Sequence, residues 1–153
     1  MVSAIIVGNS ILKRAFKEDI DITPMKLQKI IYFVYARYFE LTNKSLFNER
    51  FEPWKYGPVI RSVYDEFKYK GSNAIKKYAL DEEGNALIVK ESSSAKFKEA
   101  LDLVWEKYKD YDGIVLSSLT HKTDTAWRKA IDEGKCYLSD NDILEEAKNI
   151  FHG

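Results

Sequence analysis

Apolar residues recur at helical spacing along most of this chain, and the longest such pattern covers residues Pro24 to Thr42. Thr23 is suited to cap the N-terminus of this helix, and Pro24 fits its first position, where no backbone N–H is needed. On a helical wheel, apolar side chains fill well over half of the circumference, at Leu27, Ile30, Ile31, Tyr32, Val34, Tyr35, Tyr38, Phe39 and Leu41. A helix with so wide an apolar face is expected to be covered on several sides.

Shorter amphipathic patterns predict further helices over 3–17, from 59 to near 71, from the serines at 92–94 to about 109, over 114–119, around 126–131 and around 143–151. The interval Lys77 to Val89 differs, because Tyr78 and Leu80 alternate with smaller or polar residues before a polar turn and a short apolar run. This interval predicts a two-stranded β-hairpin. With no repeat or linker in residues 1–153, we expect a mostly α fold: a compact single-domain bundle of about six helices, with one small hairpin between helices three and four.

The long helix also carries a basic arc formed by Lys26, Lys29 and Arg37, with the aromatic Phe33 in its middle. Two interpretations of this arc stay open. It is either a solvated helix face whose aromatic is covered by the N-terminal helix, or a strip that binds a partner protein. Gln28 falls on the apolar side instead, where a buried amide needs hydrogen-bond partners.

The segment Phe47 to Val59 is predicted to join the long helix to the next one. It contains in order Trp54, Lys55, Tyr56, Gly57 and Pro58. The Gly-Pro pair turns the backbone and starts a new element. Large aromatics dominate core burial, so at least one of Trp54 and Tyr56 is expected to be buried. Alternatively, one of them anchors a partner protein, because Trp and Tyr concentrate interface energy.

Composition narrows the function classes. The chain has 24 basic and 24 acidic residues, so its formal net charge of zero creates no global field that would attract nucleic acid or anionic lipid. Its single cysteine, Cys136, cannot form an intramolecular disulfide, and no run of 18 apolar residues is present. We therefore expect a cytoplasmic protein with no membrane partner.

Recognisable catalytic and metal-binding motifs are absent: the sequence has no G-x-S-x-G, glycine-rich phosphate loop, H-E-x-x-H or C-x-x-C. We therefore expect no catalytic residue, no cofactor and no metal site. Ser117 or Ser118 with His121 leaves a nucleophile and base as an alternative. The favoured interpretation is a packed corner, in which the hydroxyls cap helix ends and His121 lies beside Trp127.

Two stretches of the chain carry a family resemblance. The first runs from T-P-M-K-L-Q-K-I-I-Y-F at 23–33 through S-L-F at 45–47 to F-E-P-W-K-Y-G-P-V at 51–59. The second is L-S-S-L-T-H at 116–121, followed by Trp127. In these motifs the chain resembles the Panacea family, also called the SocA-like antitoxin domain, whose members are also found among phage-associated proteins.

The resemblance implies an antitoxin of a bacterial or phage toxin–antitoxin pair, which neutralises a cognate toxin by direct protein contact and is not an enzyme. The residues assigned to toxin contact are Lys26, Lys29, Phe33, Arg37, Trp54, Lys55 and Tyr56. The residues assigned to the structural motif are Gln28, Gly57, Pro58, His121 and Trp127. A homodimer and a hetero-oligomer with the toxin both stay open.

Two other functions stay open as alternatives. A helix followed by a hairpin imitates a winged-helix nucleic-acid binder, and lysines flank the hairpin at 68, 70, 76 and 77. The zero net charge and the acidic residues at 81–83 disfavour nucleic acid as a partner. An adaptor that delivers its partner to a protease would use the same kind of protein interface as an antitoxin.

Overall fold

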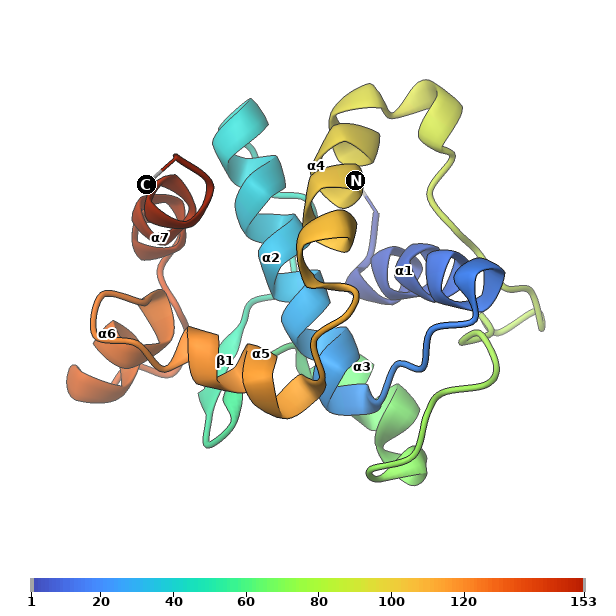
Figure 1. Ribbon diagram of the computed structural model, residues 1–153, viewed down its shortest axis with the longest axis horizontal. Coiled ribbons are helices and arrows are strands. Elements are labelled where there is room, and N and C mark those ends of the chain that lie inside the picture. The colour runs from blue at the N-terminus through green and yellow to red at the C-terminus, as the bar shows by residue number, and fades with distance from the viewer. Residues whose placement is uncertain (1, 153) are drawn as a thin grey trace.

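The computed structural model describes residues 2–152, which contain seven α-helices and one two-stranded antiparallel sheet (Figure 1). The helices are α1 (Ala4–Glu18), α2 (Pro24–Thr42), α3 (Arg61–Phe67), α4 (Ala95–Tyr108), α5 (Gly113–Thr120), α6 (Ala126–Asp132) and α7 (Asp140–His152). Strands β1 (Glu52–Trp54) and β2 (Gly57–Val59) precede α3, and short 3-10 turns cover Lys68–Lys70 and Glu91–Ser93. The mostly α fold predicted from the sequence is confirmed.

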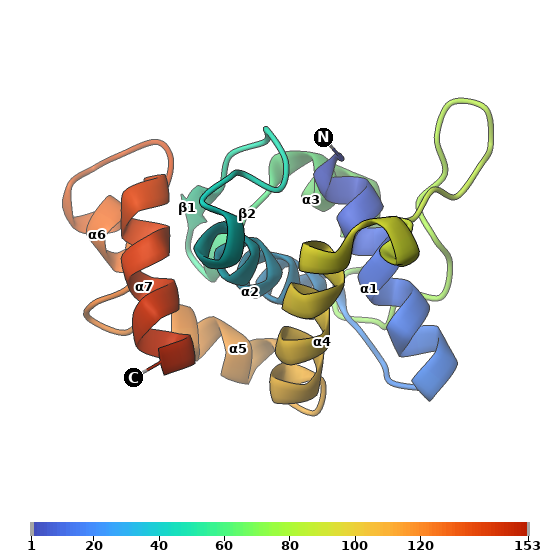
Figure 2. The ribbon, with the colours of Figure 1, turned by 90° about the horizontal axis from the view of Figure 1, so that it is seen from above.

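Helix α2 is the central element of the fold. Helices α4 and α5 lie on one side of it and α3 with the β-hairpin on the other, while α1 and α7 also contact it (Figures 1 and 2). Thr23 caps the helix by accepting a hydrogen bond from the N–H of Lys26 at 3.2 Å, and Pro24 takes the first position. All residues from 26 to 36 are buried, so the predicted cover on several sides is confirmed. Even so, no helix within residues 2–152 is long and apolar enough to cross a membrane.

The structure contains one β-hairpin, but a different segment from the predicted one forms it. Within 77–89 the structure has no strand, because the side chain of Asn9 on α1 occupies the backbone groups of this segment. Asn9 Nδ2 donates to the carbonyls of Ala79 at 2.9 Å and Leu87 at 3.0 Å, and the N–H of Ala79 donates to Asn9 Oδ1 at 2.9 Å. The prediction that the hairpin lies between helices three and four is therefore wrong, because the observed hairpin lies before α3. The winged-helix order, which needs a hairpin after that helix, is wrong with it.

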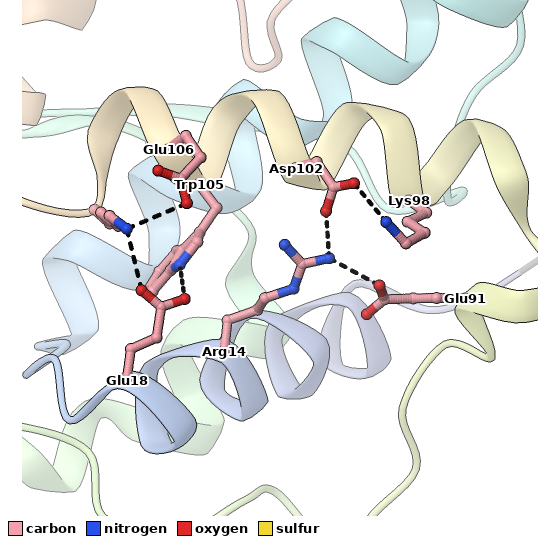
Figure 3. Close-up of polar contacts among 8 residues, drawn as sticks. Arg14, Glu18, Glu91, Lys98, Asp102, Trp105 and Glu106 are labelled. Atoms are coloured by element: carbon pink, nitrogen blue, oxygen red, sulfur yellow. Dashed lines mark hydrogen bonds and ion pairs between the residues drawn. The ribbon is translucent and has the colours of Figure 1, made fainter.

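A set of polar side chains joins α1 to α4 and is called here the α1–α4 network (Figure 3). Its members are Arg14, Glu18, Glu91, Lys98, Asp102, Trp105, Glu106 and Lys109. Arg14 pairs with Glu91 at 2.8 Å and with Asp102 at 2.7 Å, and the indole of Trp105 donates to Glu18 at 2.8 Å. The network holds α1 against α4 at the edge of the core.

Candidate functional site

The turn between β1 and β2 fits closely against α2 and α5. Gly57 has a φ of 115°, a conformation that residues with a Cβ rarely adopt. A Cβ added there would lie 2.6 Å from Oγ1 of Thr120 and 2.7 Å from Cε of Lys29. Both the backbone angle and the available space require glycine at this position.

Lys29 is buried beneath this turn, with 1% of its surface exposed. Its Nζ donates to the carbonyl of Pro58 at 3.3 Å, and within residues 2–152 it forms no ion pair with a carboxylate. Removal from water disfavours the ammonium form and lowers the pKa of Lys29 to about 7. A lysine near its own pKa at neutral pH therefore lies at the centre of the first family-like stretch.

Gln28 lies beside Lys29 and ties α2 to the start of α3. Its Nε2 donates to the carbonyl of Ile60 at 3.0 Å, and the N–H of Ile60 donates to its Oε1 at 2.9 Å. The buried amide thus has the hydrogen-bond partners that its position on the apolar side demands. The bonds of Gln28 and Lys29 join the long helix to the turn and the next helix. The sequence predicted that the segment 47–59 makes this junction, but not that Lys29 takes part in it.

The second family-like stretch packs directly onto the first. The hydroxyl of Ser117 on α5 donates to the carbonyl of Tyr56, and the indole Nε1 of Trp127 on α6 donates to the carbonyl of Trp54 at 2.6 Å. Two helices from the C-terminal half of the chain therefore satisfy the backbone of the turn. The sequence indicated both stretches but not that they touch.

His121 is packed flat against Trp127, with ring centroids 3.9 Å apart and an angle of 10° between the rings. Burial, and then the positive charges of Arg128 and Lys29, lower the pKa of this imidazole. Ser118 donates to the carbonyl of Val115, and the hydroxyl of Ser117 is bonded to the turn, so neither serine is bonded to His121. The arrangement is a packed corner and not a nucleophile with its base.

The basic arc of α2 is not an exposed strip, which corrects the surface expected from the sequence. Lys26 and Phe33 are buried under α4 and the segment after it, whereas Lys29 is buried under the turn between β1 and β2. Phe33 stacks on Tyr108 with ring centroids 4.4 Å apart, and Lys26 Nζ donates to the carbonyl of Lys109. None of these three side chains is exposed enough to form an interaction strip along α2.

Arg37, at the far end of the arc, is partly exposed. Its guanidinium pairs with Glu40 and lies 5.6 Å from the ring centroid of Phe151 on α7. It thus lies apart from the turn and joins α2 to the last helix. Among the four α2 residues assigned to toxin contact, it is the one that keeps appreciable exposure.

The aromatics of the turn are more exposed than the sequence predicted. Tyr56 is 55% exposed, Lys55 is exposed and Trp54 is partly exposed, so the expectation that Trp54 or Tyr56 is buried is wrong. The reason is that the backbone carbonyls of the turn, and not its side chains, face α5 and α6. The same bonds that fix the turn therefore leave its side chains outside.

Two residues of α3 extend this surface. The ring of Tyr64 meets Trp54 edge-on with centroids 4.7 Å apart, and the guanidinium of Arg61 lies 5.0 Å from the Trp54 ring. We call the set Trp54, Lys55, Tyr56, Arg61 and Tyr64 the turn patch. The sequence assignment missed Arg61 and Tyr64, although their spacing of three residues places them on one face of a helix. Residues 2–152 contain no group of His, Cys, Asp and Glu side chains arranged to hold a metal ion.

Comparisons with known proteins agree on one family. The profile of the family described as "Antitoxin SocA-like, Panacea domain" matches residues 27–128. Antitoxin SocA of Caulobacter vibrioides (strain NA1000 / CB15N) is 32% identical over 131 residues, which cover 82% of this chain and 69% of that protein. No solved structure matches the chain. The profile match begins within α2 and ends just after Trp127, so it includes the second stretch and all of the first except residues 23–26.

Proposed function

The chain belongs to the SocA-like Panacea family of antitoxins, and we propose that it neutralises its cognate toxin by direct contact through the turn patch. The family is one of antitoxins and not of enzymes, so its members act by binding. The question for the structure is which surface makes the contact.

One observation carries the choice of the turn patch. Segments from α2, α5 and α6 all bond to the backbone between Trp54 and Ile60, and the side chains of Trp54 and Tyr56 are left partly or largely exposed. A surface that is fixed from within binds without losing much conformational freedom on association. Tryptophan, tyrosine and arginine are also the residues that contribute most to protein interfaces.

The charge of the patch suggests how the toxin approaches. Lys55 and Arg61 are both exposed and basic, although Arg61 also pairs with Glu52 at 3.0 Å. A basic rim beside aromatic rings favours an acidic surface on the toxin and speeds association at low salt. Buried Lys29 supports the turn from below, whereas Lys26, Phe33 and Arg37 lie outside the patch.

The test is co-expression with the protein encoded by the adjacent gene, followed by growth and binding measurements. Tyr56→Ala removes a largely exposed ring, so it should weaken binding about 10- to 100-fold, or about 1–3 kcal/mol, without lowering the thermal unfolding temperature. Growth should then be lost while the level of folded antitoxin is unchanged.

The matched control is Tyr69→Ala, because Tyr69 is an even more exposed tyrosine in the 3-10 turn after α3. This variant should neutralise the toxin as well as the unchanged chain does. Full neutralisation by Tyr56→Ala, or by Lys55→Glu, would place the contact elsewhere. An adjacent gene product that is harmless by itself would remove the basis of the proposal.

A further inference from the structure

A cleft of about 660 Å³ is lined by residues of α2, α4, α5, the connection from α5 to α6, and α7. Figure 2 shows how these helices are arranged. Phe33, Tyr108 and Glu146 line it and are each at most 3% exposed, so they form its floor. Lys122 and Asp124 line it as exposed rim residues, and Ile150 on α7 is partly exposed. The cleft therefore combines an aromatic and apolar wall with a buried carboxylate.

The carboxylate of Glu146 is bonded on one side only. Its Oε1 accepts hydrogen bonds from the hydroxyl of Tyr32 at 2.6 Å and from the N–H of Ala126 at 2.9 Å. Its Oε2 is buried and has no hydrogen-bond partner within residues 2–152. Buried polar atoms are almost always paired, so this oxygen is a candidate acceptor for a donor brought by a ligand.

The surroundings do not neutralise Glu146 by a direct ion pair. Burial, offset in part by the bonds from Tyr32 and Ala126, raises the pKa of the carboxyl to about 7. The closest basic influence is Lys129, which pairs instead with Asp142 at 3.8 Å. A cation brought to Oε2 by a ligand would stabilise the charged form of Glu146 and would use its free acceptor.

The shape of the cleft specifies what kind of donor fits. A long side chain with an apolar stem and a charged tip would pack its stem against Tyr108 and Ile150 and place the tip at the floor. The charged residues that line the cleft are Lys107, Lys122, Asp124 and Glu146, so the rim lysines and the acids balance. Among these charged residues, Glu146 has the buried acceptor without a hydrogen-bond partner, and such an oxygen complements a cation and not an anion.

We propose that this cleft receives a basic side chain, arginine or lysine, of the cognate toxin, with its tip at Oε2 of Glu146. This inference rests on the proposed antitoxin function for the identity of the partner. No residue that lines the cleft belongs to the turn patch: the cleft is lined from α2, α4, α5, α7 and the α5–α6 connection, whereas the patch is formed by the hairpin and α3. The toxin would thus be held at two places.

A test that does not need the toxin uses N-acetyl-arginine amide as the probe and N-acetyl-citrulline amide as its neutral counterpart. In NMR titrations of the full chain, the arginine probe should bind weakly and saturably and shift the amides around Glu146, whereas the citrulline probe should bind at least fivefold more weakly. Equal binding of the two probes, or no binding of either one, would overturn the proposal.

Variants connect the probe to the carboxylate. Glu146→Gln keeps the shape but places an amide or a neutral oxygen at the free position, so binding of the arginine probe should fall at least fivefold. Glu145→Gln is the matched control, because this neighbouring carboxylate is 62% exposed and pairs only at the surface with Lys148. Lys122→Glu, at the exposed rim, should instead tighten arginine binding about threefold and gives an answer even if Glu146→Gln unfolds.

Toxin binding then separates the two proposals. If the cleft acts as inferred, Glu146→Gln should weaken the toxin complex about tenfold while Glu145→Gln leaves it unchanged. A toxin complex that is equally tight in both variants overturns the cleft and leaves the turn patch standing. Absence of any toxin complex with the unchanged chain contradicts the proposed function, whereas the arginine probe still tests the cleft.

Discussion

Two groups of charged residues in this molecule differ in how their charges are balanced. In the α1–α4 network, Arg14 is paired with both Glu91 and Asp102, and the side chains are 20–43% exposed (Figure 3). Lys29 and Glu146 are instead almost fully buried and lack an ion-pair partner within residues 2–152. Every charged side chain of the network has an ion-pair partner within it, whereas Lys29 and Glu146 have none within residues 2–152.

The difference separates charges that need no function from charges that suit binding. An exposed, paired charge contributes little to stability and needs no function. A buried, unpaired charge destabilises the folded state, and such departures from good local design concentrate at functional sites. Lys29 supports the turn patch and Glu146 lies under the cleft, so both unpaired charges are next to the two surfaces proposed for the toxin.

The largest expected effect comes from Gly57→Ala, which tests whether the turn locks Lys29 in place. The added methyl meets Lys29 and Thr120 at less than 3 Å, and the backbone angle is strained for alanine as well. Together these should lower the free energy of unfolding by about 4 kcal/mol, measured by denaturant titration.

Gly84→Ala is the matched control for that experiment. Gly84 also has a positive φ, of 83°, but a Cβ there meets nothing within 4 Å. It should cost only the strain of the angle, about 1 kcal/mol. Equal losses in the two variants would mean that the space around Gly57 relaxes freely and that Lys29 is not held by the turn.

How much the sequence could predict is clearest in α2. The Thr23-Pro24 start and the wide apolar face gave its bounds and its central position correctly, because capping and periodicity are local properties. The same wheel could not show that α4 covers Phe33 and that the β1–β2 turn covers Lys29, since packing partners are not encoded in one helix. Phe33 and Lys29 were therefore placed on a surface that does not exist.

The hairpin illustrates the same limit. The alternation of Tyr78 and Leu80 suggested a strand, but Asn9, far away in the sequence, binds the backbone there in place of a partner strand. The true strands are only three residues long and contain prolines at 53 and 58, which weakens any strand pattern. The cleft with Glu146 was missed because its walls come from four separate helices and one connection.

The next largest effect concerns the pH dependence of stability due to Lys29. Its pKa is about 7 in the folded chain and near 10.5 when exposed, so the unfolded state binds more protons between these values. The stabilisation linked to neutral Lys29 is therefore present above about pH 10.5 and lost as the pH falls through about 7. Lys29→Met should remove this slope and raise the free energy of unfolding at pH 6 by about 3 kcal/mol.

Glu146 is expected to change the stability with pH in the opposite direction, and Glu146→Gln tests this. The pKa of Glu146 is about 7 in the folded chain against 4.5 when exposed, so its contribution is present below about pH 4.5 and lost as the pH rises through about 7. The glutamine variant should lack this fall and be about 2 kcal/mol more stable than the unchanged chain at pH 8. Denaturant titrations from pH 4 to 10 would show both windows, and parallel curves for all three proteins would contradict the buried-charge description.

The smallest effect on the free energy of unfolding is expected in the α1–α4 network. Its size tests whether paired charges at the edge of the core matter less than the buried, unpaired ones. Arg14→Ala removes two ion pairs whose partners remain partly solvated, so the free energy of unfolding should fall by only about 1 kcal/mol and less in 1 M salt. Lys76→Ala removes an isolated pair with Asp21, both more than two-thirds exposed, and should change nothing measurable. If Arg14→Ala instead cost as much as Gly57→Ala, this network and not the turn would be the main constraint on the fold, because paired charges at the edge of the core would then outweigh the close packing beneath the turn.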